Sequence, residues 1–148
     1  MKTTVPLLLL VFFPLHAGAI PSTDPTGSFD WSLLQGKWAE STEHQFGCRA
    51  ENVNQWLTVS DDKKILTFNN DRKWKIGSGQ VVEKYTASII RSSTNVLVIR
   101  YGDDLPDIPD EFREWEMRFI GPGTYRWRAT TWPHGTYNDV IGVKCSTQ

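Results

Sequence analysis

Hydrophobic and polar residues alternate in short runs along most of this chain, and turn residues separate the runs. Between Val53 and Val59, for example, every second residue falls on the same face of an extended segment. Alternation with a period of two is typical of β-strands that have one buried face. On this pattern we expect strands over residues 37–44, 53–59, 65–69, 74–76, 81–91, 96–101, 113–120, 124–131 and 137–144.

Short polar connections join these segments in order. Turn residues cluster at Asp61–Lys63, Asn69–Asp71, Ser92–Asn95, Gly121–Gly123 and Pro133–Gly135. Only Phe29–Gln35 suits a short helical turn, and no stretch has the period of a longer amphipathic helix. About eight short strands indicate an all-β sandwich or barrel, and hairpin connections favour an up-and-down order. Because a closed barrel leaves no exposed strand edge, the expected fold is an eight-stranded antiparallel up-and-down barrel.

The amino-terminal residues differ from the rest. Residues 5–15 are almost wholly apolar, Lys2 precedes them, and Ala17-Gly18-Ala19 follows. This is the pattern of a secretory signal, and the apolar run is shorter than the roughly 20 residues needed to span a bilayer. We therefore expect a secreted, extracellular protein with a signal peptide at 1–19, a leader and short turn at 20–35, and one barrel domain at 36–148.

The charge balance argues against two classes of partner. The full chain has 16 basic and 17 acidic residues, and loss of Lys2 with the signal makes the formal charge one unit more negative than −1. Such a balance gives no support to binding of nucleic acid or of anionic membranes. No second apolar run approaches membrane length, so no membrane span is expected.

Cys48 and Cys145 are the two cysteines of the sequence. In an oxidising compartment an even pair is most simply a disulfide, which would tie the carboxyl end of the barrel to the region before the second strand. Two free thiols are the alternative.

Residues 29–38 read Phe-Asp-Trp-Ser-Leu-Leu-Gln-Gly-Lys-Trp. Gly36 suits a sharp turn into the first strand, and Trp38 brings a large ring to bury there. This F-D-x3-L-x-G-x-W pattern resembles the first-strand signature of the lipocalins, which are secreted eight-stranded barrels that carry small ligands. The resemblance implies that Trp38 closes one end of the barrel.

The resemblance extends along the chain to Cys145. Residues 48–69 are similar to the second and third strands of insect bilin-binding and apolipoprotein-D-like lipocalins, and residues 119–125 match the family's Thr-Asp-Tyr turn in part. In the family the last strand ends in an arginine that packs on the signature tryptophan, and Lys144 is the nearest candidate for that place. We expect no counterpart of the family's C-terminal helix.

A barrel of eight strands has room for side chains and one small ligand. The side chains expected to face inward and to bind a ligand are Trp56, Phe68, Tyr85, Ile89, Val98, Phe119, Tyr125 and Trp127. They are chosen from alternation and size, and a register slip of one residue would reverse the face of a strand. The alternative is that these rings fill the interior and leave no space for a ligand.

Other residues that carry chemistry give weaker signals. Arg126 and Arg128 flank Trp127 and are expected in solvent outside the barrel; facing inward, they would suit a ligand carboxylate. His44 and His134 have no further histidine or cysteine close in sequence that would complete a metal site, so no metal and no cofactor are expected. The acidic residues between 103 and 111 do not follow a calcium-binding spacing.

The sequence contains no Gly-x-Ser-x-Gly, no His-Glu-x-x-His and no glycine-rich phosphate loop, so no enzyme is expected. The leading hypothesis is a secreted carrier of one small hydrophobic molecule, of the lipid, pigment or odorant class, held by burial of apolar surface. The alternative is a secreted interaction module with a filled barrel that binds a protein partner through its loops.

Overall fold

The computed structural model of the chain describes residues 27–41, 47–49, 53–75, 80–102, 105 and 108–145. The expected signal peptide, the first part of the leader, His44, and the acidic residues Asp103, Asp104 and Asp107 lie outside the described residues. In chain order the elements are the 3-10 helix η1 (Trp31–Leu34), strands β1 (Lys37–Ser41), β2 (Val53–Val59), β3 (Ile65–Lys75), β4 (Val81–Ser93) and β5 (Val96–Tyr101), the 3-10 helix η2 (Asp110–Phe112), and strands β6 (Glu114–Gly121), β7 (Thr124–Ala129) and β8 (Ile141–Lys144).

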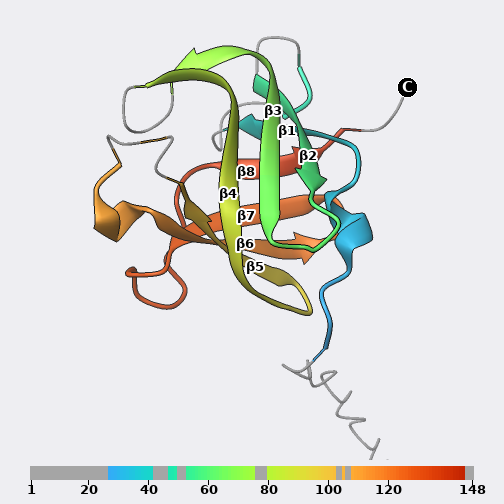
Figure 1. Cartoon of the computed structure of the whole chain (residues 1–148). Helices are drawn as coiled ribbons and strands as arrows, with labels where there is room; N and C mark the ends of the chain where they lie inside the picture. Colours follow the sequence, from blue (N-terminus) through green and yellow to red (C-terminus); the bar gives the residue numbers. More distant parts are fainter. Residues whose placement is uncertain are drawn as a thin grey trace, which may run out of the picture.

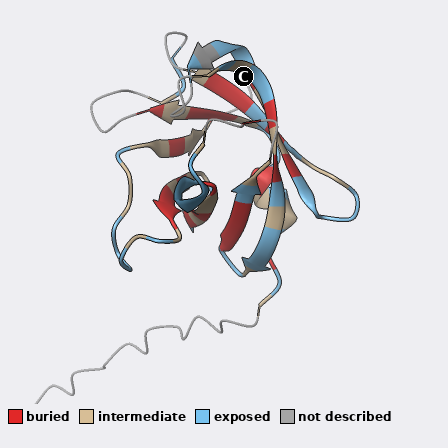
Figure 2. Cartoon of the chain, turned by 60° about the vertical axis from the view of Figure 1, so that its left-hand side comes forward, coloured by how far each residue is buried: buried red, intermediate tan, exposed pale blue. Residues whose placement is uncertain are grey.

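The eight strands form one closed antiparallel barrel in which each strand pairs with its neighbours in sequence (Figure 1). The first and last strands close the ring, with Trp38 opposite Lys144 and Ser41 opposite Ile141. The predicted fold class, strand number and up-and-down order are therefore confirmed. Exposed residues gather at the hairpin tips and buried ones form bands along the strands (Figure 2).

Two segments differ from the sequence prediction. The turn expected at Asn69–Asp71 is wrong, because β3 continues through it to Lys75. Asn70 stays in the ladder opposite Gln55, and the register with β4 shifts between Asn69 and Trp74. Asn69 keeps ladder partners in both β2 and β4, and the register shift accommodates the residues that follow it. The last strand begins at Ile141 instead of residue 137.

One end of the barrel is covered by η1, and we call this end the floor (Figure 1). Asp30 caps η1 by accepting a hydrogen bond from the backbone N–H of Ser32, at 3.0 Å. Gly36 then turns the chain into β1 with a φ of +108°, in the left-handed region that favours glycine. The local sequence thus places Trp38 directly above η1, where its Nε1 donates to the carbonyl of Leu34 at 3.1 Å.

Trp38 is fully buried and forms the centre of the floor. Its ring lies 5.0 Å from that of Tyr125 and 5.9 Å from that of Phe119, measured between centroids. The Nζ of Lys144 lies 5.4 Å from the Trp38 ring and donates to the carbonyl of Leu33. A cation–aromatic contact is therefore present at the position where the lipocalin resemblance led us to look for one.

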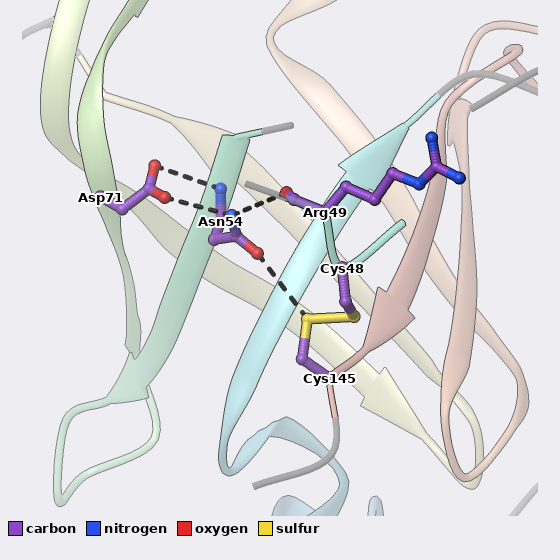
Figure 3. Close-up of a disulfide and its surroundings, with 5 residues drawn as sticks. All are labelled: Cys48, Arg49, Asn54, Asp71 and Cys145. Atoms are coloured by element: carbon purple, nitrogen blue, oxygen red, sulfur yellow. Dashed lines mark hydrogen bonds between the residues drawn. A yellow bond between two sulfur atoms is a disulfide. The ribbon is translucent and has the colours of Figure 1, made fainter. Parts of the chain in front are cut away.

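A disulfide joins Cys48 to Cys145 on the outside of β1 and β8, as predicted (Figure 3). Beside it, the side-chain amide of buried Asn54 donates to Asp71 at 3.1 Å and to the carbonyl of Arg49 at 3.4 Å. The carboxylate of Asp71 also accepts from the Asn54 backbone N–H. The loop that carries Cys48 is thus held against the barrel by both covalent and polar contacts.

Candidate functional site

Most of the side chains predicted to face inward do meet inside the barrel. Phe68, Tyr85, Phe119, Tyr125 and Trp127 are all buried and belong to one hydrophobic cluster, and Ile89 packs against it. Phe68 and Tyr85 stack with their centroids 4.6 Å apart, and Tyr125 meets Trp127 edge to face at 5.6 Å. Aromatic side chains from four strands therefore line the interior above the floor.

The inward orientation expected for Trp56 is wrong. Its side chain is 44% exposed, and the Nζ of Lys37 lies 5.6 Å from its ring. On β2 the inward positions are instead those of Gln55 and Leu57, since Leu57 belongs to the core cluster and Gln55 reaches Tyr125. The size of the indole suggested burial, but the alternation of the strand decides its face.

Val98 is buried but lies on the outer face. Its neighbours Leu97 and Ile99 belong to the interior cluster, whereas Val98 sits opposite Glu116 in the ladder. Glu116 in turn pairs with Arg128 of β7 across the outer face, at 2.9 Å. The run from Val96 to Ile99 is buried on both faces, so hydrophobicity alone could not assign its inward side.

Arg126 and Arg128 are outside the barrel, as expected, but neither is simply solvated. Arg128 is buried and donates to the carbonyl of Trp132 at 2.7 Å. Arg126 donates to the carbonyl of Asn138 at 3.0 Å. The segment after β7 therefore folds back over this outer face and covers both guanidinium groups.

Glu40 is a charged interior residue that the sequence reasoning did not select. It is partly exposed, and its Oε1 accepts hydrogen bonds from the Tyr125 hydroxyl at 2.8 Å and from Trp127 Nε1 at 2.7 Å. Glu40 shares the face of Trp38 by simple alternation, so its direction could be read from the sequence. It was missed because the search for inward residues considered size and apolarity and left out charge.

Two further residues, Gln55 and Gly142, hold Tyr125 in place beside Glu40. Gln55 Nε2 donates to the Tyr125 hydroxyl at 2.8 Å, so this hydroxyl bridges an amide and a carboxylate. Gly142 lies directly against the Tyr125 ring, and a Cβ at that position would overlap the ring atoms. The absence of a side chain at residue 142 therefore gives the phenol the room to reach Glu40.

Burial and the charge of Glu40 keep the interior phenols neutral. Burial is the main reason that the pKa values of Tyr85, Tyr101 and Tyr125 are raised well above the usual value, and the nearby Glu40 carboxylate raises each further. Tyr101 also contributes to the raised pKa of Tyr85. At neutral pH these hydroxyls are therefore hydrogen-bond donors or acceptors without charge.

Asn70 adds a third polar side chain to the interior, after Glu40 and Gln55. It is on the inward face of β3, opposite Gln55, and is 7% exposed. Among the described residues, neither its amide nitrogen nor its amide oxygen has a hydrogen-bond partner, and both atoms are shielded from solvent. A buried polar group without a partner is rare and calls for a water, a ligand or a local rearrangement to satisfy it.

Comparisons with known proteins give no relative for this chain: no family model, no curated protein and no solved structure matches it. In the part of the chain that the structure describes, no helix is long and apolar enough to cross a membrane. Among the same residues, no three His, Cys, Asp or Glu side chains are grouped to hold a metal ion. His134 lies exposed in the loop before β8.

Proposed function

We propose that this protein is a secreted, lipocalin-like carrier that binds one small, largely hydrophobic molecule inside its barrel. The observation that carries the proposal is the aromatic interior above the Trp38 floor, in which Glu40 remains partly exposed although its partners Tyr125 and Trp127 are buried. A ligand would enter through the end of the barrel that η1 does not cover and bury its apolar surface against the rings.

The aromatic side chains inside the barrel support a small hydrophobic ligand. Rings at Phe68, Tyr85, Tyr101 and Trp127 offer broad apolar surface at low cost in side-chain entropy. Apolar burial contributes about 25 cal/mol per Å². The disulfide fits the oxidising compartment to which the amino-terminal signal pattern points.

The proposal is tested by titrating the mature protein with N-phenyl-1-naphthylamine, a neutral apolar fluorophore whose emission rises in an apolar site. We expect saturable binding of one probe per chain. Trp127→Leu should weaken the binding at least about fivefold, because a large interior ring is lost. The matched control is Trp56→Leu, which removes an equal indole from the outer face and should leave the affinity within about twofold, since a surface change rarely reaches a distant site.

Native mass spectrometry of the protein purified from its source provides the complementary measurement. A bound small molecule would support the carrier. Absence of any bound molecule, together with failure of the fluorophore to bind and a stable complex with another protein, would favour the interaction module instead.

A further inference from the structure

Among the residues that the structure describes, the interior carboxylate of Glu40 has no counter-ion. Both of its hydrogen bonds converge on Oε1, and no described cation forms an ion pair with either carboxylate oxygen. Its described donors, a phenol and an indole, are neutral. The carboxylate is therefore oriented by two hydrogen bonds while its second oxygen, Oε2, keeps its capacity to accept.

Two basic side chains that pack close to the barrel, those of Lys144 and Arg113, are engaged in other contacts. Lys144 lies at the floor, with its Nζ on the Leu33 carbonyl and the Trp38 ring. Arg113, just before β6, donates to the carbonyl of Gly102 at 2.8 Å and pairs with Asp110 at 3.3 Å. Neither contact directs a positive charge at Glu40.

The surroundings of Glu40 favour a cation in a second way. The negative charge of Glu40 acts on Tyr85, Tyr101 and Tyr125, which places these phenols within electrostatic reach of the carboxylate. The Tyr85 and Tyr101 rings lie 5.9 Å apart, and Phe68 stacks on Tyr85. Ring faces carry a partial negative charge. Together with the carboxylate they give this part of the interior a negative electrostatic potential.

From these contacts we infer that the ligand of this barrel is a small organic cation, an ammonium or amidinium group on an apolar body. The positive group pairs with Glu40 Oε2, and the apolar body packs on the rings of Phe68, Tyr85 and Trp127. This inference rests on the proposed carrier function and specifies its ligand class. A partly buried carboxylate is stabilised by a partner of opposite charge, whereas a neutral ligand would desolvate it without compensation and an anion would repel it.

The test compares three probes that share one apolar body and differ in the terminal group. Isothermal titration calorimetry at neutral pH measures 4-phenylbutylamine (protonated), 4-phenylbutan-1-ol (neutral) and 4-phenylbutanoate (anionic). We expect the ammonium to bind about tenfold more tightly than the alcohol, in line with a hydrogen bond to a charged group, and the carboxylate to bind more weakly than either.

Glu40→Gln then isolates the charge. The amide oxygen of glutamine can still accept from Tyr125 and Trp127, so the shape of the site is retained while the charge is removed. In this variant the ammonium should lose its advantage over the alcohol, and the affinity of the alcohol should be unchanged or higher. Asp61→Asn is the matched control, because it removes one negative charge from the exposed β2–β3 connection and should preserve the preference of the wild type.

Each result decides between the two proposals. Equal affinities for ammonium and alcohol, or an ammonium preference that survives Glu40→Gln, would overturn the cation inference. If N-phenyl-1-naphthylamine still binds in that case, the proposed carrier function is retained and only the inference of a cationic ligand fails. If neither the fluorophore nor any of the three probes binds, both the inference and the carrier function fail.

Discussion

At the scale of single residues, two buried asparagines show opposite uses of the same side chain. The amide of Asn54 bonds to Asp71 and to the carbonyl of Arg49, and it helps to hold the disulfide loop on the barrel (Figure 3). The amide of Asn70 has no hydrogen-bond partner inside the barrel. Loss of hydration without a replacement bond costs about 1–3 kcal/mol, so Asn70 is a local source of instability.

Replacing Asn70 with leucine should therefore raise the free energy of unfolding by about 1 kcal/mol, because the volume is similar and an unsatisfied amide is removed. Asn54→Leu should lower it by about 1–3 kcal/mol, because it leaves the partners of the amide unpaired. Urea denaturation of both variants measures the difference. A larger loss of stability in Asn70→Leu than in Asn54→Leu would contradict the assignment of Asn70 as unpaired.

The inward face of β2 shows what a sequence can and cannot predict at this scale. Alternation correctly groups Gln55 with Leu57 and separates them from Trp56, but it does not say which group faces the interior. Ring size favoured Trp56, and the structure places the smaller polar Gln55 inside, where Tyr125 accepts its hydrogen bond. A buried polar side chain of this kind is paired by a residue 70 positions away, which no local pattern reveals.

At the scale of elements, the outer face of β6 and β7 carries an ionic cluster of Glu116, Arg118 and Arg128. Burial opposes ionisation of Glu116, but hydrogen bonds from Arg128 and Arg118 outweigh it and hold the pKa of Glu116 below the usual value. Both Glu116 and Arg128 are at most 7% exposed at the side chain. The pair fixes the β6–β7 register beneath the segment that follows β7.

A lowered folded-state pKa stabilises the protein above the unfolded-state pKa of Glu, about 4.3, and this contribution is lost as pH falls through the folded value. Glu116→Gln should flatten the pH dependence of unfolding in that acidic range. At neutral pH it should also lower the free energy of unfolding by about 3 kcal/mol, because Arg128 keeps a buried charge without its partner.

Chemical denaturation at several pH values, from neutral to strongly acidic, measures the effect. Glu114→Gln, two residues earlier on the same strand, is the control and should change the curve little. The lowered pKa values of Asp30, Asp62 and Asp71 contribute to acid sensitivity in every variant, so the difference between curves isolates Glu116. Curves for Glu116→Gln and wild type that remain parallel down to the acid limit would contradict this account.

The elements themselves were largely predictable, and their exceptions have physical causes. Short turns and alternation located β2, β4, β5 and β6 to within a few residues. Asn69–Asp71 looked like a turn because asparagine and aspartate favour turns in isolation. Pairing of Asn69 with β2 and β4, and of Asn70 with β2, overrides that preference, since the ladder supplies partners that a local sequence cannot show.

At the scale of the whole molecule, the contact between β1 and β8 closes the barrel, and it joins the parts of the domain that are farthest apart in sequence. The Cys48–Cys145 disulfide lies beside this β1–β8 contact and joins residues that are 97 positions apart in the sequence. A link across so long a loop restricts the unfolded chain strongly, which favours the folded state.

The variant Cys48→Ala/Cys145→Ala should unfold with a free energy about 2–4 kcal/mol lower than the wild type. Urea denaturation measures the loss, and it should also show a steeper denaturant dependence, since an unlinked chain exposes more surface on unfolding. Reduction of the wild type should reproduce both changes. A variant as stable as the wild type would show that the hydrogen-bonded pairing of β1 with β8 is sufficient to keep the barrel closed.

The same bond has a consequence for what proteolysis can release from the protein. A single backbone cut anywhere between the two half-cystines would leave amino- and carboxyl-terminal pieces covalently attached, so the nicked molecule would keep its mass apart from one added water. Release of a fragment from that region requires either a second cut or a reductant.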